Sequence, residues 1–159
     1  MPRNTILLVA LWLIFLLTTS ACSSGNKTKL DSDDFGSTSA RVSALEKEII
    51  SPSSFADTEF ELFNVNGFSN DRSSIPGASS RDYQYVIKLS PTDVLLWTED
   101  MVSLEGVDQD LSWMQQIVQK RPNTWKTETQ PEYFKRPGGD VILVVYRQEG
   151  IVYKRVTDL

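Results

Sequence analysis

The chain contains a single cysteine, Cys22, and no histidine among its 159 residues. One cysteine cannot form an intramolecular disulfide, so the fold depends on side-chain packing alone. The absence of histidine removes the commonest general base near neutral pH and the commonest metal ligand. Hydrolases that use a histidine base and zinc sites built on histidine are therefore excluded, and we expect no metal or other cofactor.

The N-terminal segment has the pattern of a signal peptide. Arg3 precedes an unbroken apolar run at residues 6–17. These 12 residues, at about 1.5 Å each in a helix, fall well short of the ~30 Å hydrocarbon core that a membrane-spanning helix must cross. The run therefore indicates the hydrophobic core of a signal peptide and not a transmembrane anchor.

Small residues follow this run directly before the cysteine, in the order Thr19, Ser20, Ala21 and Cys22. This ending resembles the lipobox of bacterial lipoproteins, with Thr19 at the position where the family usually has leucine. The resemblance covers residues 1–22 only. It implies that signal peptidase II cleaves before Cys22, which carries a thioether-linked diacylglycerol and is then acylated on its new amine.

The lipobox has two alternatives, an ordinary secretory signal cleaved after Ala21 and an uncleaved N-terminal anchor. Lipidation is favoured because the only cysteine of the chain stands at the one position where a lipobox needs it. Two or three acyl chains, unlike one, anchor a protein stably to a bilayer. Ser23 follows the cysteine where aspartate would direct retention, so by resemblance to Gram-negative sorting we expect the periplasmic side of the outer membrane.

Removing residues 1–21 takes away only Arg3 among the charged residues. The mature chain then has 138 residues, with 15 basic and 21 acidic side chains and a net charge of −6. This length suits one domain and a tail. The acidic balance argues against a nucleic-acid partner, because basic surface supplies most of the affinity for nucleic acid.

The composition divides the mature chain into a tether and a domain. Residues 22–40, rich in Ser, Gly, Asn, Lys and Asp, are expected to be the lipidated cysteine and a flexible tether that lets the domain move about 20 to 25 Å from the bilayer. Residues 41–52 are expected to form a short helix and a linker, with the helix beginning near Thr38 or Ser39. Residues 53–159 are expected to be a single α+β domain.

Alternating or β-branched runs predict the strands of this domain. Lys154 and Arg155 indicate that the last strand is an edge strand. The apolar residues 141–146 predict the central strand, buried on both faces. The expected strands are residues 58–65, 83–89, 141–146 and 151–156, with weaker strand character at 125–129 and 133–134.

Two amphipathic helices are predicted between the second and third of these strands. Ser90 and Pro91 form a helix start, and an apolar stripe continues to about residue 102 before Glu105 and Gly106. A second helix extends from about residue 110 to 120, before Pro122. The predicted fold is an antiparallel sheet of four or five strands with both helices packed on one face, and a small split barrel is the alternative.

A basic and aromatic segment at residues 120–136 stands out in this acidic chain. Arginine and aromatic side chains often dominate binding energy at interfaces. The residues expected to bind a partner, if they converge on one surface, are Arg121, Trp125, Lys126, Tyr133, Lys135 and Arg136. A helix end and a hairpin explain much of the same pattern structurally.

Acidic residues offer the other candidate site, because paired carboxylates can hydrolyse glycosides. The candidates Glu99, Asp100, Asp108 and Asp110 also occupy ordinary positions for helix faces and caps. We therefore expect no catalytic residues. The favoured function is a lipid-anchored, non-enzymatic domain that binds an envelope protein or an anionic envelope component, and the alternative is a carboxylate-dependent envelope hydrolase.

Overall fold

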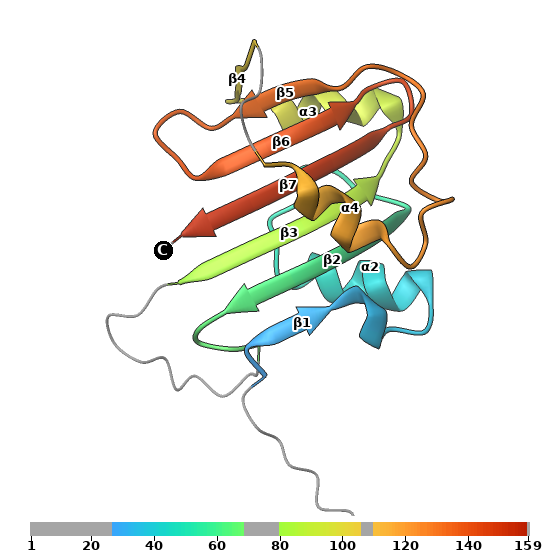
Figure 1. Ribbon diagram of the computed structural model, residues 1–159, viewed down its shortest axis with the longest axis vertical. Coiled ribbons are helices and arrows are strands. Elements are labelled where there is room, and N and C mark those ends of the chain that lie inside the picture. Colours follow the sequence, from blue (N-terminus) through green and yellow to red (C-terminus); the bar gives the residue numbers. More distant parts are fainter. Residues whose placement is uncertain (1–26, 69–79, 106–109, 159) are drawn as a thin grey trace, which may run out of the picture.

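The computed structural model describes residues 27–68, 80–105 and 110–158 (Figure 1). The predicted signal peptide and lipidation site lie outside these residues, as does Asp108. Within the described ranges, no helix combines the length and the hydrophobicity that a membrane span requires.

The architecture is α+β, with one antiparallel sheet of seven strands in the order β1-β2-β3-β7-β6-β5-β4. The strands are β1 (Lys29–Asp31), β2 (Asp57–Asn64), β3 (Arg81–Lys88), β4 (Val102–Ser103), β5 (Glu132–Lys135), β6 (Val141–Tyr146) and β7 (Ile151–Asp158). The expected count of four or five strands was too low. The edge strands β1 and β4 have three and two residues, too few to show a period of two in the sequence.

In the described part of the chain, three short α-helices pack with the sheet: α2 (Thr38–Glu46), α3 (Val94–Thr98) and α4 (Ser112–Val118). The Ser37 side chain accepts a hydrogen bond from the Ala40 N–H and caps α2, close to the expected start. The first helix of the predicted pair is much shorter than expected. A 3-10 turn, η2 (Pro91–Asp93), leads into α3, and Asp100 with a φ of 62° turns the chain away before β4.

Helices cover both faces of the sheet, which corrects the expectation that two helices pack on one face. Figure 1 shows α4 in front of the sheet and α3 behind it. Along β3, Tyr85 and its same-face neighbours pack with α2 and α3, whereas Val86 packs with α4. The strand β6 is apolar on both faces, with Leu143 and Val144 fully buried on opposite sides, so each face needs its own cover. We call the two sides the α3 face and the α4 face.

The last strand lies in the middle of the sheet, so the expectation of an edge strand was wrong. β7 pairs with β3 on one side and with β6 on the other. Its two cations are accommodated by different means on the two faces. Arg155 donates to Asp82 at 3.0 and 2.8 Å on one face, and Lys154 lies over the ring of Trp97 on the other.

The packed structure also begins earlier in the chain than the expected boundary at residue 53. β1 pairs with β2, where Leu30 is opposite Leu62. The ring centroids of Phe35 and Phe60 are 5.9 Å apart, and Leu30 and Phe35 pack against the core of the α3 face. Two large apolar side chains are therefore enough to fix part of the segment expected to be a tether.

The turn between β6 and β7 requires glycine. Gly150 has a φ of 63°, and a Cβ built on it would lie 2.1 Å from the backbone oxygen of Leu89. The Leu89 N–H in turn donates to the Gly150 oxygen at 2.9 Å. This close approach joins the turn to the chain that leaves β3 for η2.

The first prediction concerns Val144, which is fully buried in β6. In the mature chain made soluble by Cys22→Ser, Val144→Asp would bury an unpaired carboxylate at a cost of several kcal/mol, comparable to the ~5 to 15 kcal/mol stability of a small domain. We expect loss of cooperative thermal melting, measured by circular dichroism. Gln148→Asp, at an exposed position in the next turn, is the control. A melting midpoint equal to that of the control would contradict the packing of β6.

Candidate functional site

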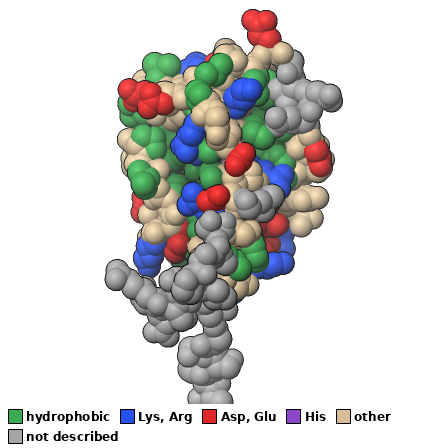
Figure 2. Space-filling model, turned by 90° about the vertical axis from the view of Figure 1, so that its left-hand side faces the viewer, with side chains coloured by type: hydrophobic (Ala, Val, Ile, Leu, Met, Phe, Trp, Pro, Cys, Tyr) green, Lys and Arg blue, Asp and Glu red, His purple; other side chains and the backbone are tan. Residues whose placement is uncertain are grey.

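The six residues expected to form one binding surface are divided by the fold. Arg121 and Trp125 lie in the loop after α4, and the other four lie in that loop, on β5 or in the turn after β5. Figure 2 shows the end of the sheet that carries this turn, where Lys and Arg side chains are interspersed with hydrophobic and acidic ones. Cations therefore do not gather into a single patch on this side of the molecule.

Arg121 is part of an ion network on β2. Its Nη1 and Nη2 donate to the Asp57 carboxylate at 3.0 and 2.9 Å, and its Nε donates to Glu59. The Glu59 side chain is only 5% exposed. Arg121 also lies over the buried Trp125, with its Cζ 5.9 Å from the ring centroid. Both residues therefore hold α4 and its following loop on the sheet.

A second arginine reaches the same carboxylates from α2. Arg41 Nη2 is 3.5 Å from Asp57 Oδ1, and its Nε is 4.0 Å from Glu59 Oε2. The backbone oxygen of Thr58 accepts from Arg41 Nε at 3.3 Å and from Arg121 Nη2 at 3.2 Å. β1 pairs only with residues 61–63 of β2. The two guanidinium groups therefore supply the hydrogen-bond donors for the Thr58 oxygen, which β1 does not reach.

The network keeps Asp57 ionised. Burial opposes ionisation, but hydrogen bonds from Arg121 and the Thr58 N–H, with the charges of Arg121 and Arg41, outweigh it and lower the pKa of Asp57. Sequence reasoning missed this network, because Glu59 alternates with Phe60 like a solvent-facing strand residue. Two segments that lie apart in the chain bury it, α2 before β2 and the loop after α4.

Tyr133 lies in a depression on the α4 face, which we call the aromatic depression. Tyrosines from three neighbouring strands and residues of α4 surround a volume of about 260 Å³, and the lining residues are Leu111, Met114, Gln115, Tyr133, Tyr146 and Tyr153. Tyr153 meets Tyr146 edge-on with ring centroids 6.2 Å apart, and meets Trp113 in the same way at 6.2 Å. Burial raises the pKa of Tyr153, so its phenol stays neutral.

The remaining cations of the predicted surface point in different directions. Lys135 pairs in register with Ile142 and Val102 at the β4 edge. The charge of Arg136 acts instead on Tyr85 and Lys154, which belong to the α3 face. Lys126 is exposed beyond Trp125. Of the six, only Tyr133 lines the aromatic depression.

The acidic candidates occupy ordinary structural positions. Glu99 and Asp100 are exposed at the end of α3. Asp110 accepts a hydrogen bond from the Ser112 N–H at 2.9 Å at the start of α4, and hydrogen bonds from Ser112 lower its pKa. Asp108 lies outside the described residues. No two of the described candidates face each other across a described pocket.

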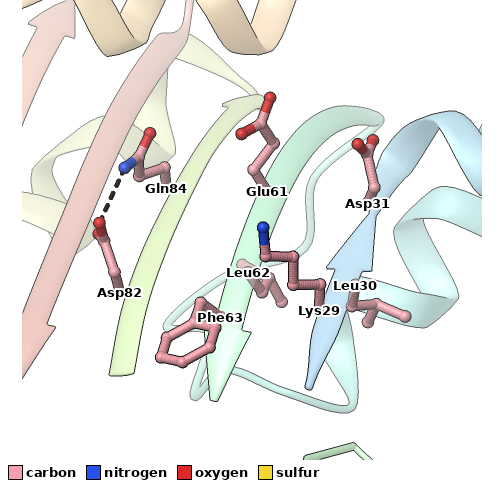
Figure 3. Close-up of a pocket in the computed structure, with 8 residues that line it drawn as sticks. All are labelled: Lys29, Leu30, Asp31, Glu61, Leu62, Phe63, Asp82 and Gln84. Atoms are coloured by element: carbon pink, nitrogen blue, oxygen red, sulfur yellow. Dashed lines mark hydrogen bonds between the residues drawn. The ribbon is translucent and has the colours of Figure 1, made fainter. Parts of the chain in front are cut away.

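Other carboxylates, missed in the sequence, line a groove on the first three strands (Figure 3). The groove has a volume of about 280 Å³ and is lined by Lys29, Leu30, Asp31, Glu61, Leu62, Phe63, Asp82 and Gln84. Figure 3 shows Lys29 extending from β1 over β2, with Glu61 and Asp31 on adjacent strands. Burial and the charges of Asp31 and Asp33 raise the pKa of Glu61. Asp82 is held by Arg155 and by the Gln84 amide at 3.0 Å.

The ion network gives the second prediction. Arg121→Met leaves Asp57 and Glu59 with only the more distant Arg41, so we expect a loss of about 2 to 3 kcal/mol in the free energy of unfolding at pH 7, measured in urea. The pKa of Asp57 is lower in the folded protein than in the unfolded chain, so its ionised carboxylate stabilises the fold at any pH above the unfolded-state pKa. This stabilisation is lost as the pH falls through the folded-state pKa. The stability difference between pH 7 and pH 3 should therefore shrink in Arg121→Met.

Lys126→Met is the matched control, because Lys126 is exposed and has no ion pair with any described residue. Its free energy of unfolding should stay within about 0.5 kcal/mol of the parent value. Equal free energies of unfolding for Arg121→Met and Lys126→Met would show that the ion network does not stabilise the fold.

Neither geometry nor comparison identifies a cofactor or a family. Among residues 27–68, 80–105 and 110–158, no group of three or more acidic, histidine or cysteine side chains is arranged to hold a metal ion. Comparisons of the chain with protein-family models, curated proteins and solved structures found no match.

Proposed function

We propose that this protein is a bacterial lipoprotein of the cell envelope, anchored through lipid on Cys22 and presenting a small non-enzymatic binding domain. The lipobox-like residues before Cys22 support the anchor, and Ser23 supports sorting to the periplasmic side of the outer membrane. The partner is an envelope protein. Anchoring concentrates a weak binder at one surface, which raises its effective concentration there.

The point at which the chain joins the domain sharpens this proposal. Lys27, five residues after Cys22, accepts a hydrogen bond from the Phe68 N–H at 3.0 Å, and β1 begins at Lys29. Five extended residues span at most about 18 Å. A lipid on Cys22 would therefore keep the domain next to the bilayer, closer than the flexible tether expected at residues 22–40 would.

The aromatic depression is the observation that carries the binding role. It combines three tyrosines and Met114, residue types that are enriched at protein interfaces, with the apolar side chain of Leu111. Within the described part of the chain, the hydroxyl groups of these tyrosines have no hydrogen-bond partner, so they are available to a bound segment. Exposed Gln115 supplies a polar rim.

The alternative, a carboxylate-dependent hydrolase, would act at the groove of Figure 3. The raised pKa of Glu61 suits a proton donor. We rank this function second because Arg155 and Gln84 engage the Asp82 carboxylate, which a nucleophile or general base would need free. Release of reducing ends from envelope glycans by the purified domain would place it first.

Lipidation gives the third prediction. Cys22→Ser in the full precursor should abolish labelling by a radioactive fatty acid, because the acylated thiol and the new N-terminal amine are both lost. The variant should accumulate as unprocessed precursor or as soluble protein. Ser20→Thr, which keeps the cysteine, should still be labelled. Unchanged labelling of Cys22→Ser would reject the lipoprotein assignment, and recovery of the parent mainly with inner membranes would reject the sorting.

Binding at the aromatic depression gives the fourth prediction. A photo-crosslinking phenylalanine analogue at Gln115, in the full lipoprotein in cells, should capture one envelope protein identified by mass spectrometry. The same analogue at Gln116 is the matched control, since Gln116 is also exposed on α4 but does not line the depression. Tyr146→Ala combined with the analogue at Gln115 should reduce capture at least about tenfold, as expected for loss of a central aromatic contact.

Equal capture from positions 115 and 116, or capture unchanged by Tyr146→Ala, would exclude the depression as the binding site. The thermal melting midpoint of Tyr146→Ala serves as a check that the variant is folded at the temperature of the experiment.

A further inference from the structure

Lys154 occupies an unusual place for a lysine, in the central strand and on the α3 face. Its register neighbours are Tyr85 on β3 and Leu143 on β6, which are both buried. The Lys154 Nζ lies over the buried ring of Trp97 from α3, 5.4 Å from the ring centroid. The ammonium group therefore projects from a strand whose neighbours on this face are apolar or aromatic.

No anion balances this charge within the described residues. The contact with Trp97 is the interaction that the structure gives to the Lys154 ammonium, and no described carboxylate forms an ion pair with it. A second cation, Arg136, lies just after β5, where its N–H donates to the Val141 oxygen at 3.0 Å and extends the pairing of β5 with β6. Alternation places it on the side of Phe134, which packs on the α3 face and pairs with Leu143, the neighbour of Lys154, and its charge acts on Lys154. Arg136 is exposed and likewise has no ion pair with a described residue.

Two neighbouring cations without an anion are electrostatically unfavourable. Burial of the ammonium and the like charge of Arg136 lower the pKa of Lys154 to about 8. The groups facing Lys154 from the surrounding elements are Tyr85 on β3, Leu143 on β6, Trp97 on α3 and Arg136 after β5. Burial raises the pKa of Tyr85, so its phenol is neutral and supplies no counter-charge.

We propose that Lys154 and Arg136 form a binding site for one phosphate group on the α3 face. Two cations match the two charges of a phosphate monoester. The guanidinium can donate two parallel hydrogen bonds to phosphate oxygens, while the ammonium acts as a point charge. Bound phosphate removes the repulsion between the two cations. This site lies on the opposite face from the aromatic depression, so its test is independent of the proposed function.

The test follows the titration of Lys154 in the mature chain with Cys22→Ser, by NMR of carbon-labelled lysine side chains. Lys154→Met identifies the signal. In chloride, the Lys154 midpoint should lie near pH 8. In saturating orthophosphate at equal ionic strength it should rise by about one pH unit, the shift expected if protonated Lys154 binds phosphate about tenfold more tightly than neutral Lys154. An identical midpoint in chloride and phosphate would overturn the proposal.

Variants at neighbouring positions make the result specific. Arg136→Gln should raise the midpoint in chloride, because a like charge is removed, and yet reduce the further rise caused by phosphate. Lys135→Gln is the matched control, since Lys135 pairs with Ile142 and does not act on Lys154. It should change neither quantity. A phosphate effect that survives Arg136→Gln undiminished would overturn the two-cation site.

The source of the phosphate is distinguished by separate additions of glycerol phosphate and of phosphatidylcholine vesicles with or without phosphatidic acid. A rise of the midpoint with the soluble ester identifies a soluble ligand. A rise with vesicles that contain phosphatidic acid, at a phosphate concentration where glycerol phosphate has no effect, identifies a lipid headgroup. Both support the site. A rise with acetate as large as that with phosphate would overturn the assignment to phosphate.

Discussion

The ion network on β2 is the interaction on which the arrangement of the helices depends. Asp57 and Glu59 are held by Arg41 from α2 and by Arg121 after α4, and the oxygen of Thr58 accepts from both. The two helices cover opposite faces of the sheet. One short stretch of β2, beyond the residues that pair with β1, thus holds both helices. The two arginines also donate hydrogen bonds to the Thr58 oxygen, which β1 does not reach.

The central position of β7 sets the chemistry of the two faces. Because a strand alternates its side chains, Lys154 and Arg155 must lie on opposite sides. Arg155 forms an ion pair with Asp82 on β3, and its charge is therefore compensated within the sheet. Lys154 instead lies over an aromatic ring and near another cation. The asymmetry explains why one of two adjacent basic residues is a structural member of an ion pair and the other is available to an external anion.

The sequence predicted the long elements well and their surroundings poorly. β2, β3, β6 and β7 lie within two residues of the predicted bounds, because each is long enough to show alternation or a β-branched run. β1 and β4 are too short to do so. The α+β class was therefore confirmed only coarsely. The prediction of an edge position for β7 was wrong. Charged residues in a strand indicate an edge when they have only solvent to face, whereas Arg155 pairs with Asp82 and Lys154 lies over Trp97.

The candidate site was harder to predict, because it depends on which segments meet. Arg121 and Trp125 are residue types that favour binding hot spots. In the structure, however, Arg121 donates hydrogen bonds to Asp57 and Glu59, more than 60 residues earlier in the chain, and is part of the fold. Tyr133 was named on the same pattern and does line a depression, with Tyr146 and Tyr153 from strands that the sequence treated as core. A residue type that favours interfaces also favours buried ion pairs and aromatic clusters. What separates the two uses is the partner across the sheet, and no spacing along the chain encodes it.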